Sequence, residues 1–259
     1  MKTQLGNLFL SLVIINTCLF FGCKKESQTT NPSTGTLLFH LHTDVDSLEV
    51  EGYNKIDTLS GGRKISLTLA QLYISNIQLV KLDGSLYNVP GAILLKTFEY
   101  EPYIIGEVPA GNYKSVRFWV GLDSVTNLKV PSGIPDSILN KPAMWFGSSA
   151  QPQGYIFVNL QGKIDTTAKG NGTVAQMQPF SYKIGTNTNY KQVVMPDQNF
   201  TVFPNQQGFV HIIIDYMQLL KGIQLNKSSN LSVSSPSDNA TALGKAISNN
   251  IPSMFHYEE

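Results

Sequence analysis

Short apolar runs with a period of two constrain the fold of this chain more than any other feature of its sequence. Every second residue of segment 116–122 is a large apolar one, and the turn-forming sequence Pro-Ala-Gly-Asn stands just before it. Residues 37–42 repeat the alternation, while residues 155–160 and 210–214 are nearly continuous runs of β-forming side chains. Alternation indicates strands with one buried face, and the continuous runs predict central strands buried on both faces.

Helix-forming patterns are scarce. Residues 67–73 have the spacing of one short helical turn, and Leu243, Ile247 and Ile251 stand at i, i+4 and i+8 in a helix predicted for residues 241–250. Gly, Pro and Asn separate the strand segments, and Asp83-Gly84 is a strong turn signal. The sequence predicts an all-β fold, an antiparallel β-sandwich of Greek-key or jelly-roll-like topology with a short C-terminal helix.

The N-terminus has the pattern of a bacterial export signal. Lys2 precedes an apolar run too short to span a bilayer, and the run ends in Leu-Phe-Phe-Gly-Cys, which resembles a lipobox. We predict a lipoprotein signal peptide over residues 1–22, a lipid on Cys23, a polar tether over residues 23–35 and a domain over residues 36–257. An ordinary signal peptide or an uncleaved anchor is the alternative. The predicted location is the bacterial cell envelope, with an outer-membrane lipoprotein facing the periplasm or the cell surface.

Composition narrows the possible chemistry. The chain has two cysteines, Cys18 and Cys23, and both lie in the targeting segment, so the domain has no thiol for a disulfide or a zinc-thiolate site. A formal net charge of +1 gives no reason to expect a nucleic-acid partner. The motifs of serine hydrolases, zinc proteases, phosphate-binding loops and dinucleotide enzymes are absent, so we expect no catalytic activity.

Histidine is the scarce residue that points to a site, with four in the whole chain. His40 and His42 lie one residue apart in a predicted strand, so both imidazoles leave the same face, about 7 Å apart along the strand. That spacing allows both to reach one metal ion, and Asp44 and Asp46 extend the row. Imidazole without thiolate suits copper(II), zinc or nickel. The alternative is a polar strand face that meets solvent.

His211 stands in an apolar run that ends at Asp215. A histidine in such surroundings is more often a hydrogen-bonded core residue than a ligand. We therefore expect His211 in the core, with Asp215 as a candidate partner, and place it only third among the metal-ligand candidates.

Several segments in order over residues 35–257 resemble the copper-binding protein MbnP-like domain family of exported bacterial proteins. They include Thr-Leu-Leu-Phe-His at 36–40, Leu-Tyr-Ile-Ser-Asn-Ile-Gln-Leu-Val at 72–80, Val-Pro-Ala-Gly-Asn-Tyr at 108–113, Phe-Trp-Val-Gly-Leu-Asp-Ser at 118–124, Tyr-Lys-Ile-Gly at 182–185 and Ile-Ser-Asn-Asn at 247–250. The resemblance implies a β-sandwich and a role in copper binding or handling.

This chain also departs from the family pattern. Lys183 replaces the histidine of a Tyr-His-Ile-Gly segment, the Met-Tyr-Trp-x-Trp-like segment is reduced to Met-Trp-Phe-Gly at 144–147, and no histidine stands in residues 234–239. A lysine ammonium has no free lone pair at neutral pH and is a poor metal ligand. The resemblance thus implies either a partial site around His40 and His42 or a domain that kept the fold and lost the metal.

Two functional hypotheses follow. The first is a lipid-anchored, non-catalytic β-sandwich protein that binds copper through His40, His42 and, as the weakest candidate, His211. The second is a metal-free adhesion or interaction module on the same fold, which presents polar loops such as residues 132–153 and 228–239 to a protein or glycan. The sequence identifies no protein partner.

Overall fold

The computed structural model describes residues 33–99, 101–130, 137–148 and 151–258. The predicted signal peptide, Cys23 and all but the end of the predicted tether lie outside the described residues. Within them, no helix is both long and apolar enough to cross a membrane.

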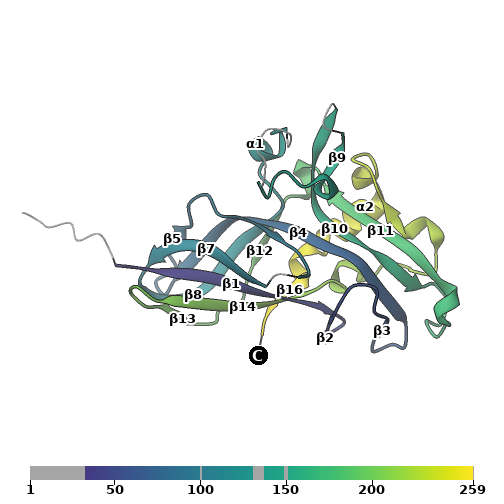
Figure 1. Cartoon of the computed structure of the whole chain (residues 1–259), viewed down its shortest axis with the longest axis horizontal. Helices are drawn as coiled ribbons and strands as arrows, with labels where there is room; N and C mark the ends of the chain where they lie inside the picture. The colour runs from purple at the N-terminus through teal and green to yellow at the C-terminus, as the bar shows by residue number, and fades with distance from the viewer. Residues whose placement is uncertain (1–32, 100, 131–136, 149–150, 259) are drawn as a thin grey trace, which may run out of the picture. The chain divides into compact units, whose positions relative to one another are not determined.

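Five strands form the smaller sheet within the described part of the chain (Figure 1). The strand β1 is central: β14 pairs with one edge in parallel, and β7 pairs with the other edge in the antiparallel direction. The strand β16 pairs with β14, and β2 folds back to pair with the end of β1, both in the antiparallel direction. The bounds are β1 Thr34–Val45, β2 Leu48–Glu49, β7 Pro102–Pro109, β14 Gln207–Asp215 and β16 Phe255–Tyr257.

The larger sheet has eleven strands among the described residues and is built around the long strand β4, Lys64–Lys81. Its main path runs β12, β8, β4, β10, β11 and β15, and the shorter strands β3, β5, β6, β9 and β13 add to it. The other bounds are β3 Asp57–Thr58, β5 Leu86–Asn88, β6 Ile93–Lys96, β8 Gly111–Val120, β9 Trp145–Gly147, β10 Pro152–Asp165, β11 Met177–Gly185, β12 Lys191–Val194, β13 Phe200–Val202 and β15 Ser232–Val233.

The two sheets enclose one main core. Phe39 of β1, Phe118 of β8 and Phe255 of β16 meet there, with ring centroids 6.0 Å apart for Phe39 and Phe118 and 5.0 Å apart for Phe118 and Phe255. The helix α2, Ala242–Asn249, contributes Ile247 to the same core, while α1, Ser124–Asn127, is a single turn capped by Asp123. Because Phe39 and Leu41 are fully buried, the residues between and after them leave the outer face of the smaller sheet.

The predicted β-sandwich with a short C-terminal helix is confirmed. The turn at Asp83-Gly84 lies between β4 and β5, and Gly84 has the positive φ of 84° that such a turn favours. Two strand pairs, β1 with β14 and β11 with β15, are parallel within a fold that we expected to be antiparallel. The local pattern of a strand does not encode the direction of a partner that arrives from a distant part of the chain.

Two local predictions were wrong. Residues 67–73 belong to β4 and form no helical turn, because their neighbours on both sides pair them into the larger sheet. The strand β10 is buried almost throughout, as predicted, but β14 is not: Val210 and Ile212 are buried whereas Phe209 and His211 are exposed. Among the described residues, none covers the outer face of the smaller sheet at Phe209 and His211, so the apolar run there is only half buried.

Candidate metal centre

His40 and His42 leave the outer face of the smaller sheet, side by side on β1. Their ring centroids are 4.4 Å apart and their planes are nearly perpendicular, at 85°. The side chains are 24% and 16% exposed, so they are half-buried but reachable from solvent. The predicted shared face is confirmed, and it follows from the two core residues Phe39 and Leu41 that fix the pleat of β1.

The parallel strand β14 brings His211 to the same place. In the strand register His211 stands directly opposite His40, and the two Nδ1 atoms are 3.2 Å apart. The expectation that His211 is a core residue was wrong: its side chain is 47% exposed, because Val210 and Ile212 take the inward positions of β14. Asp215 does not serve as its partner, since its carboxylate accepts hydrogen bonds from the backbone N–H of Asp46 and of Met217. His40, His42 and His211 offer ligand atoms that all lie within 4.8 Å of one another.

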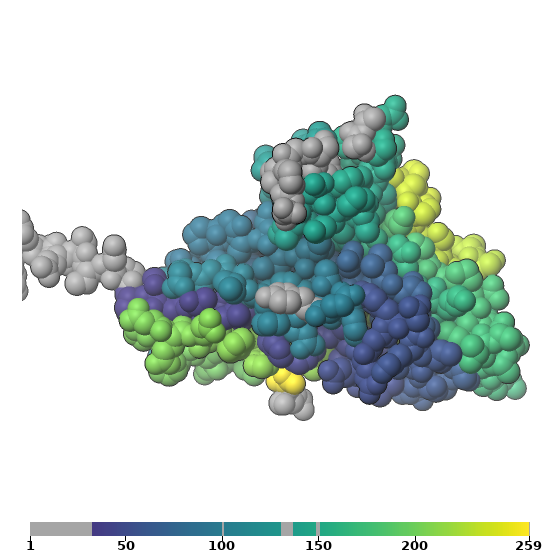
Figure 2. Space-filling model, in the orientation of Figure 1, coloured from purple at the N-terminus to yellow at the C-terminus, as the bar shows by residue number. Residues whose placement is uncertain are grey.

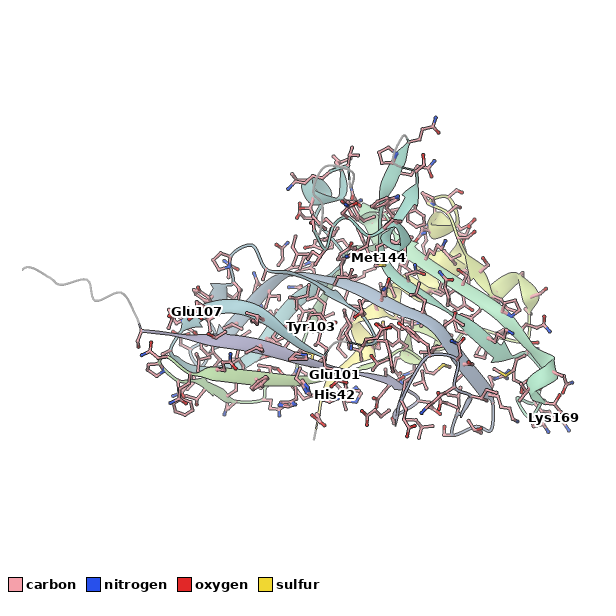
Figure 3. The ribbon with its side chains drawn as sticks, viewed as in Figure 1. His42, Glu101, Tyr103, Glu107, Met144 and Lys169 are labelled. Atoms are coloured by element: carbon pink, nitrogen blue, oxygen red, sulfur yellow. The ribbon has the colours of Figure 1, made fainter. Side chains whose placement is uncertain are left out.

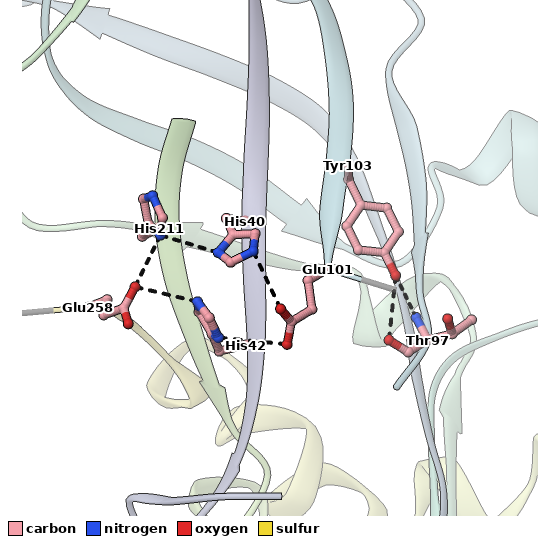
Figure 4. Close-up of polar contacts among 7 residues, drawn as sticks. All are labelled: His40, His42, Thr97, Glu101, Tyr103, His211 and Glu258. Carbon is pink, nitrogen blue, oxygen red and sulfur yellow. Dashed lines mark hydrogen bonds and ion pairs between the residues drawn. The ribbon is translucent and has the colours of Figure 1, made fainter. Parts of the chain in front are cut away.

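Two carboxylates border this histidine cluster, and neither was predicted from the sequence. Glu101, just before β7, places one oxygen 3.4 Å from His40 Nε2 and the other 3.7 Å from His42 Nδ1 (Figures 3 and 4). Glu258, just after β16, places Oε2 3.0 Å from His211 Nδ1 and 3.4 Å from His42 Nε2. Glu101 and Glu258 therefore lie on opposite sides of the cluster.

Glu101 and Glu258 both bear on which ring nitrogens carry protons. A carboxylate accepts hydrogen bonds, so Glu101 favours the N–H of a neutral His40 ring on Nε2, 3.4 Å away, and His40 Nδ1 then presents its lone pair toward His211. The two nitrogens of His42 lie between the carboxylates, with Nδ1 3.7 Å from Glu101 and Nε2 3.4 Å from Glu258, so Glu101 alone does not fix the tautomer of His42. His42 Nε2 is buried and makes no hydrogen bond of acceptable geometry, although Glu258 is close. A carboxylate in the position of Glu101 relative to His40 is the kind of outer partner that orients a metal-binding imidazole.

The electrostatics also favour a neutral imidazole at His40. Burial lowers the pKa of His40 below its ordinary value of 6.5, and the neighbouring His42 lowers it further, whereas Glu101 opposes the shift. Metal ligation requires the unprotonated nitrogen, so a lowered pKa keeps His40 competent at neutral pH. The cluster supplies three nitrogen donors and one carboxylate oxygen, a set that suits copper(II), zinc or nickel.

Asp44 and Asp46, which extend the histidine row in sequence, are not part of the cluster. Asp44, near the end of β1, is buried, and this burial, together with the nearby Asp215 carboxylate, raises the pKa of its carboxyl. Asp46 turns away beyond the strand, where its carboxylate accepts the Ser60 N–H. The fourth histidine, His256 on β16, stands opposite Ile213 and thus on the same sheet face, but outside the cluster.

Lys183 and residues 234–239 cannot complete this cluster. Tyr182 and Ile184 are buried in the core that Phe39 and Leu41 share, so Lys183 leaves the outer face of the larger sheet. Asn239 donates a hydrogen bond from Nδ2 to the Lys183 carbonyl, 3.0 Å away. The two segments that lack the histidines of the family pattern, around Lys183 and at residues 234–239, are therefore neighbours. The positions where the family resemblance expects further histidines thus lie on the opposite side of the sandwich from His40.

Replacing Glu101 by glutamine is expected to lower the affinity for copper(II) by about 10- to 100-fold, the usual effect of losing an outer-shell partner of histidine ligands. The amide keeps the size of the side chain but removes the negative charge that favours an N–H on His40 Nε2. Calorimetric titration measures the change. Glu107→Gln, farther along β7, is the matched control (Figure 3). Equal losses in both variants would contradict the role assigned to Glu101.

Comparisons with known proteins agree on one family. The MbnP family model matches residues 32–236. The solved structure of MbnP from Methylosinus trichosporium superposes with a TM-score of 0.54 over 86% of this chain and 97% of that one, at 17% sequence identity, which shows a shared fold. No curated protein matches the sequence. The chain belongs to the MbnP family.

Proposed function

We propose that this chain is a lipid-anchored, non-catalytic protein of the bacterial cell envelope that binds one copper(II) ion. His40, His42 and His211 supply nitrogen ligands, and Glu258 supplies a carboxylate oxygen. The observation that carries the proposal is the convergence of three imidazoles, from two strands, on ligand atoms that lie within 4.8 Å of one another. Glu101, 3.4 Å from His40 Nε2, supports the same assignment, because a carboxylate in that position orients a metal-binding imidazole.

Copper is the proposed ion for two reasons. The resemblance to MbnP-like proteins implies copper, and among divalent first-row metals a nitrogen and oxygen site of this kind binds copper(II) most tightly. When bound, the copper(II) ion would be a Lewis acid held by nitrogen and oxygen donors. The residues of the chain hold and orient the ion, and we assign them no catalytic step, because the sequence carries no catalytic motif beside the cluster.

The anchor rests on the N-terminal sequence. The apolar run that ends in Gly22 and Cys23, followed at once by Lys24-Lys25, supports cleavage before Cys23 and lipid attachment to it. The polar residues that follow then connect the lipid to β1, which begins at Thr34. A domain held in this way stays near the bilayer while its histidine cluster remains in aqueous solution.

A single preparation tests both parts. The protein, expressed from the full sequence and purified from bacterial membranes in mild detergent, is expected to begin at a lipid-modified Cys23 by mass spectrometry. It is also expected to bind one equivalent of copper(II) by calorimetry, with nitrogen ligands visible by electron paramagnetic resonance. His256→Ala, which removes the histidine outside the cluster, is expected to leave the titration unchanged.

Each result has a contrary outcome. An unmodified N-terminus would refute the anchor. Absence of copper binding, or its loss in His256→Ala alone, would refute the ligand assignment and favour the metal-free interaction module.

A further inference from the structure

A cavity of about 310 Å³ opens beside the histidine cluster. It lies where β16 ends along β14, and the C-terminal residues reach the surface in this region (Figure 2). Phe200, Phe209 and Tyr257 give the wall an aromatic character, and Asn199 adds an amide. A volume of this size is at the lower end of small-molecule sites.

His211 belongs both to the cavity wall and to the cluster, and Glu258, which borders the cluster, also lines the cavity. The opposite side of the cluster is closed by Glu101, which contacts His40 and His42 from the β7 side. An ion held among the three imidazoles thus has protein on its β7 side and the cavity on its β16 side. The cavity therefore offers room for a further ligand directly beside the ion, next to the solvent-exposed face of the sheet.

Phe209 connects the aromatic wall to the ligands. Its ring centroid is 6.4 Å from that of His40, in a nearly perpendicular arrangement, and 6.1 Å from that of His211. The side chain is still 45% exposed, although it is large and apolar. A flat aromatic molecule that contacts Phe209 would place an atom of its ring near the metal position.

We propose that the metal centre takes an additional small ligand from this cavity, a planar nitrogen heteroaromatic of the imidazole class with an attached apolar group. The ring nitrogen donates its lone pair to the copper ion, and no bond within the ligand breaks or forms. The apolar group packs against Phe209 and Phe200, and a ring N–H can donate a hydrogen bond to the Asn199 amide oxygen. Copper(II) favours tetragonal sets of nitrogen and oxygen ligands, which a heteroaromatic nitrogen extends. This inference rests on the proposed copper site.

The test uses the membrane-purified chain loaded with one equivalent of copper(II), titrated with 4-phenylimidazole and, separately, with imidazole. We expect 4-phenylimidazole to bind about tenfold more tightly than imidazole and to add a nitrogen signal to the paramagnetic resonance spectrum. Phe209→Ala, which removes no ligand, is expected to reduce that preference to about twofold or less. Phe203→Ala removes a similarly exposed phenylalanine outside the cavity and is expected to retain it.

The outcomes separate this inference from the copper site itself. A chain that binds copper but shows no preference for 4-phenylimidazole, or keeps the preference in Phe209→Ala, overturns the cavity assignment and leaves the copper site intact. A chain that takes up no copper overturns both.

Discussion

Replacing His40 and His42 together by alanine is expected to reduce copper(II) affinity by more than about a hundredfold. Loss of a single outer-shell partner already costs about 10- to 100-fold, and this double variant removes two of the three direct nitrogen ligands. His211 and Glu258 remain, but they adjoin each other on one side of the cluster and cannot enclose an ion. Calorimetric titration of the purified chain, beside the unchanged protein, measures the loss.

Unfolding of the double variant must be excluded as the cause of weaker copper binding. Both side chains leave the outer face of the sheet and are partly exposed, so their removal should change the free energy of unfolding by no more than about 1 kcal/mol. His256→Ala is the matched control on the same sheet face. Copper binding that survives in the double variant with undiminished affinity would show that the ion binds elsewhere.

Replacing Phe118 by alanine is expected to destabilise the domain by about 3–5 kcal/mol, the usual cost of truncating a buried phenylalanine. Phe118 is 0% exposed and lies between the two sheets, in contact with Phe39 of β1 and Phe255 of β16. Both contacts lead to strands that position the metal centre. Denaturant unfolding should show a lower midpoint with an unchanged slope.

Two substitutions calibrate that result. Phe118→Leu keeps most of the apolar volume and should cost clearly less than the alanine variant. Phe203→Ala removes an exposed ring and should stay within about 0.5 kcal/mol of the unchanged protein. A Phe118→Ala variant as stable as Phe203→Ala would mean that the two sheets do not pack through this residue.

The parts of the fold that depend on local pattern could be predicted from the sequence. The alternation around Phe39 and Leu41 placed His40 and His42 on one face, and the spacing of Leu243 and Ile247 identified the helix α2. Both inferences use neighbours within a few residues, where the geometry of a strand or helix is fixed. The helical turn predicted for residues 67–73 failed because pairing with distant strands outweighed a short local pattern.

The rest of the metal centre depends on contacts that no local pattern encodes. His211 joins His40 through a parallel register between strands whose paired residues are 171 positions apart. Glu101 lies just before β7 and Glu258 just after β16, at strand ends where a glutamate is an ordinary surface residue. One signal was available for His211. If Val210 and Ile212 face inward, strict alternation places His211 on the outer face; the interpretation of the apolar run as buried on both faces hid this signal.

The parallel pairing of β1 with β14, closed by β16, also determines when and where an ion can be taken up. An unfolded chain holds the three imidazoles at no fixed separation, and bringing such distant segments together carries the entropy cost of closing a long loop. A bound ion would hold β1 and β14 together. Because it would bind the folded domain and not the unfolded chain, its binding would stabilise the folded state. The proposed copper site would therefore form only once the domain has folded, so a chain exported unfolded would cross the membrane without metal.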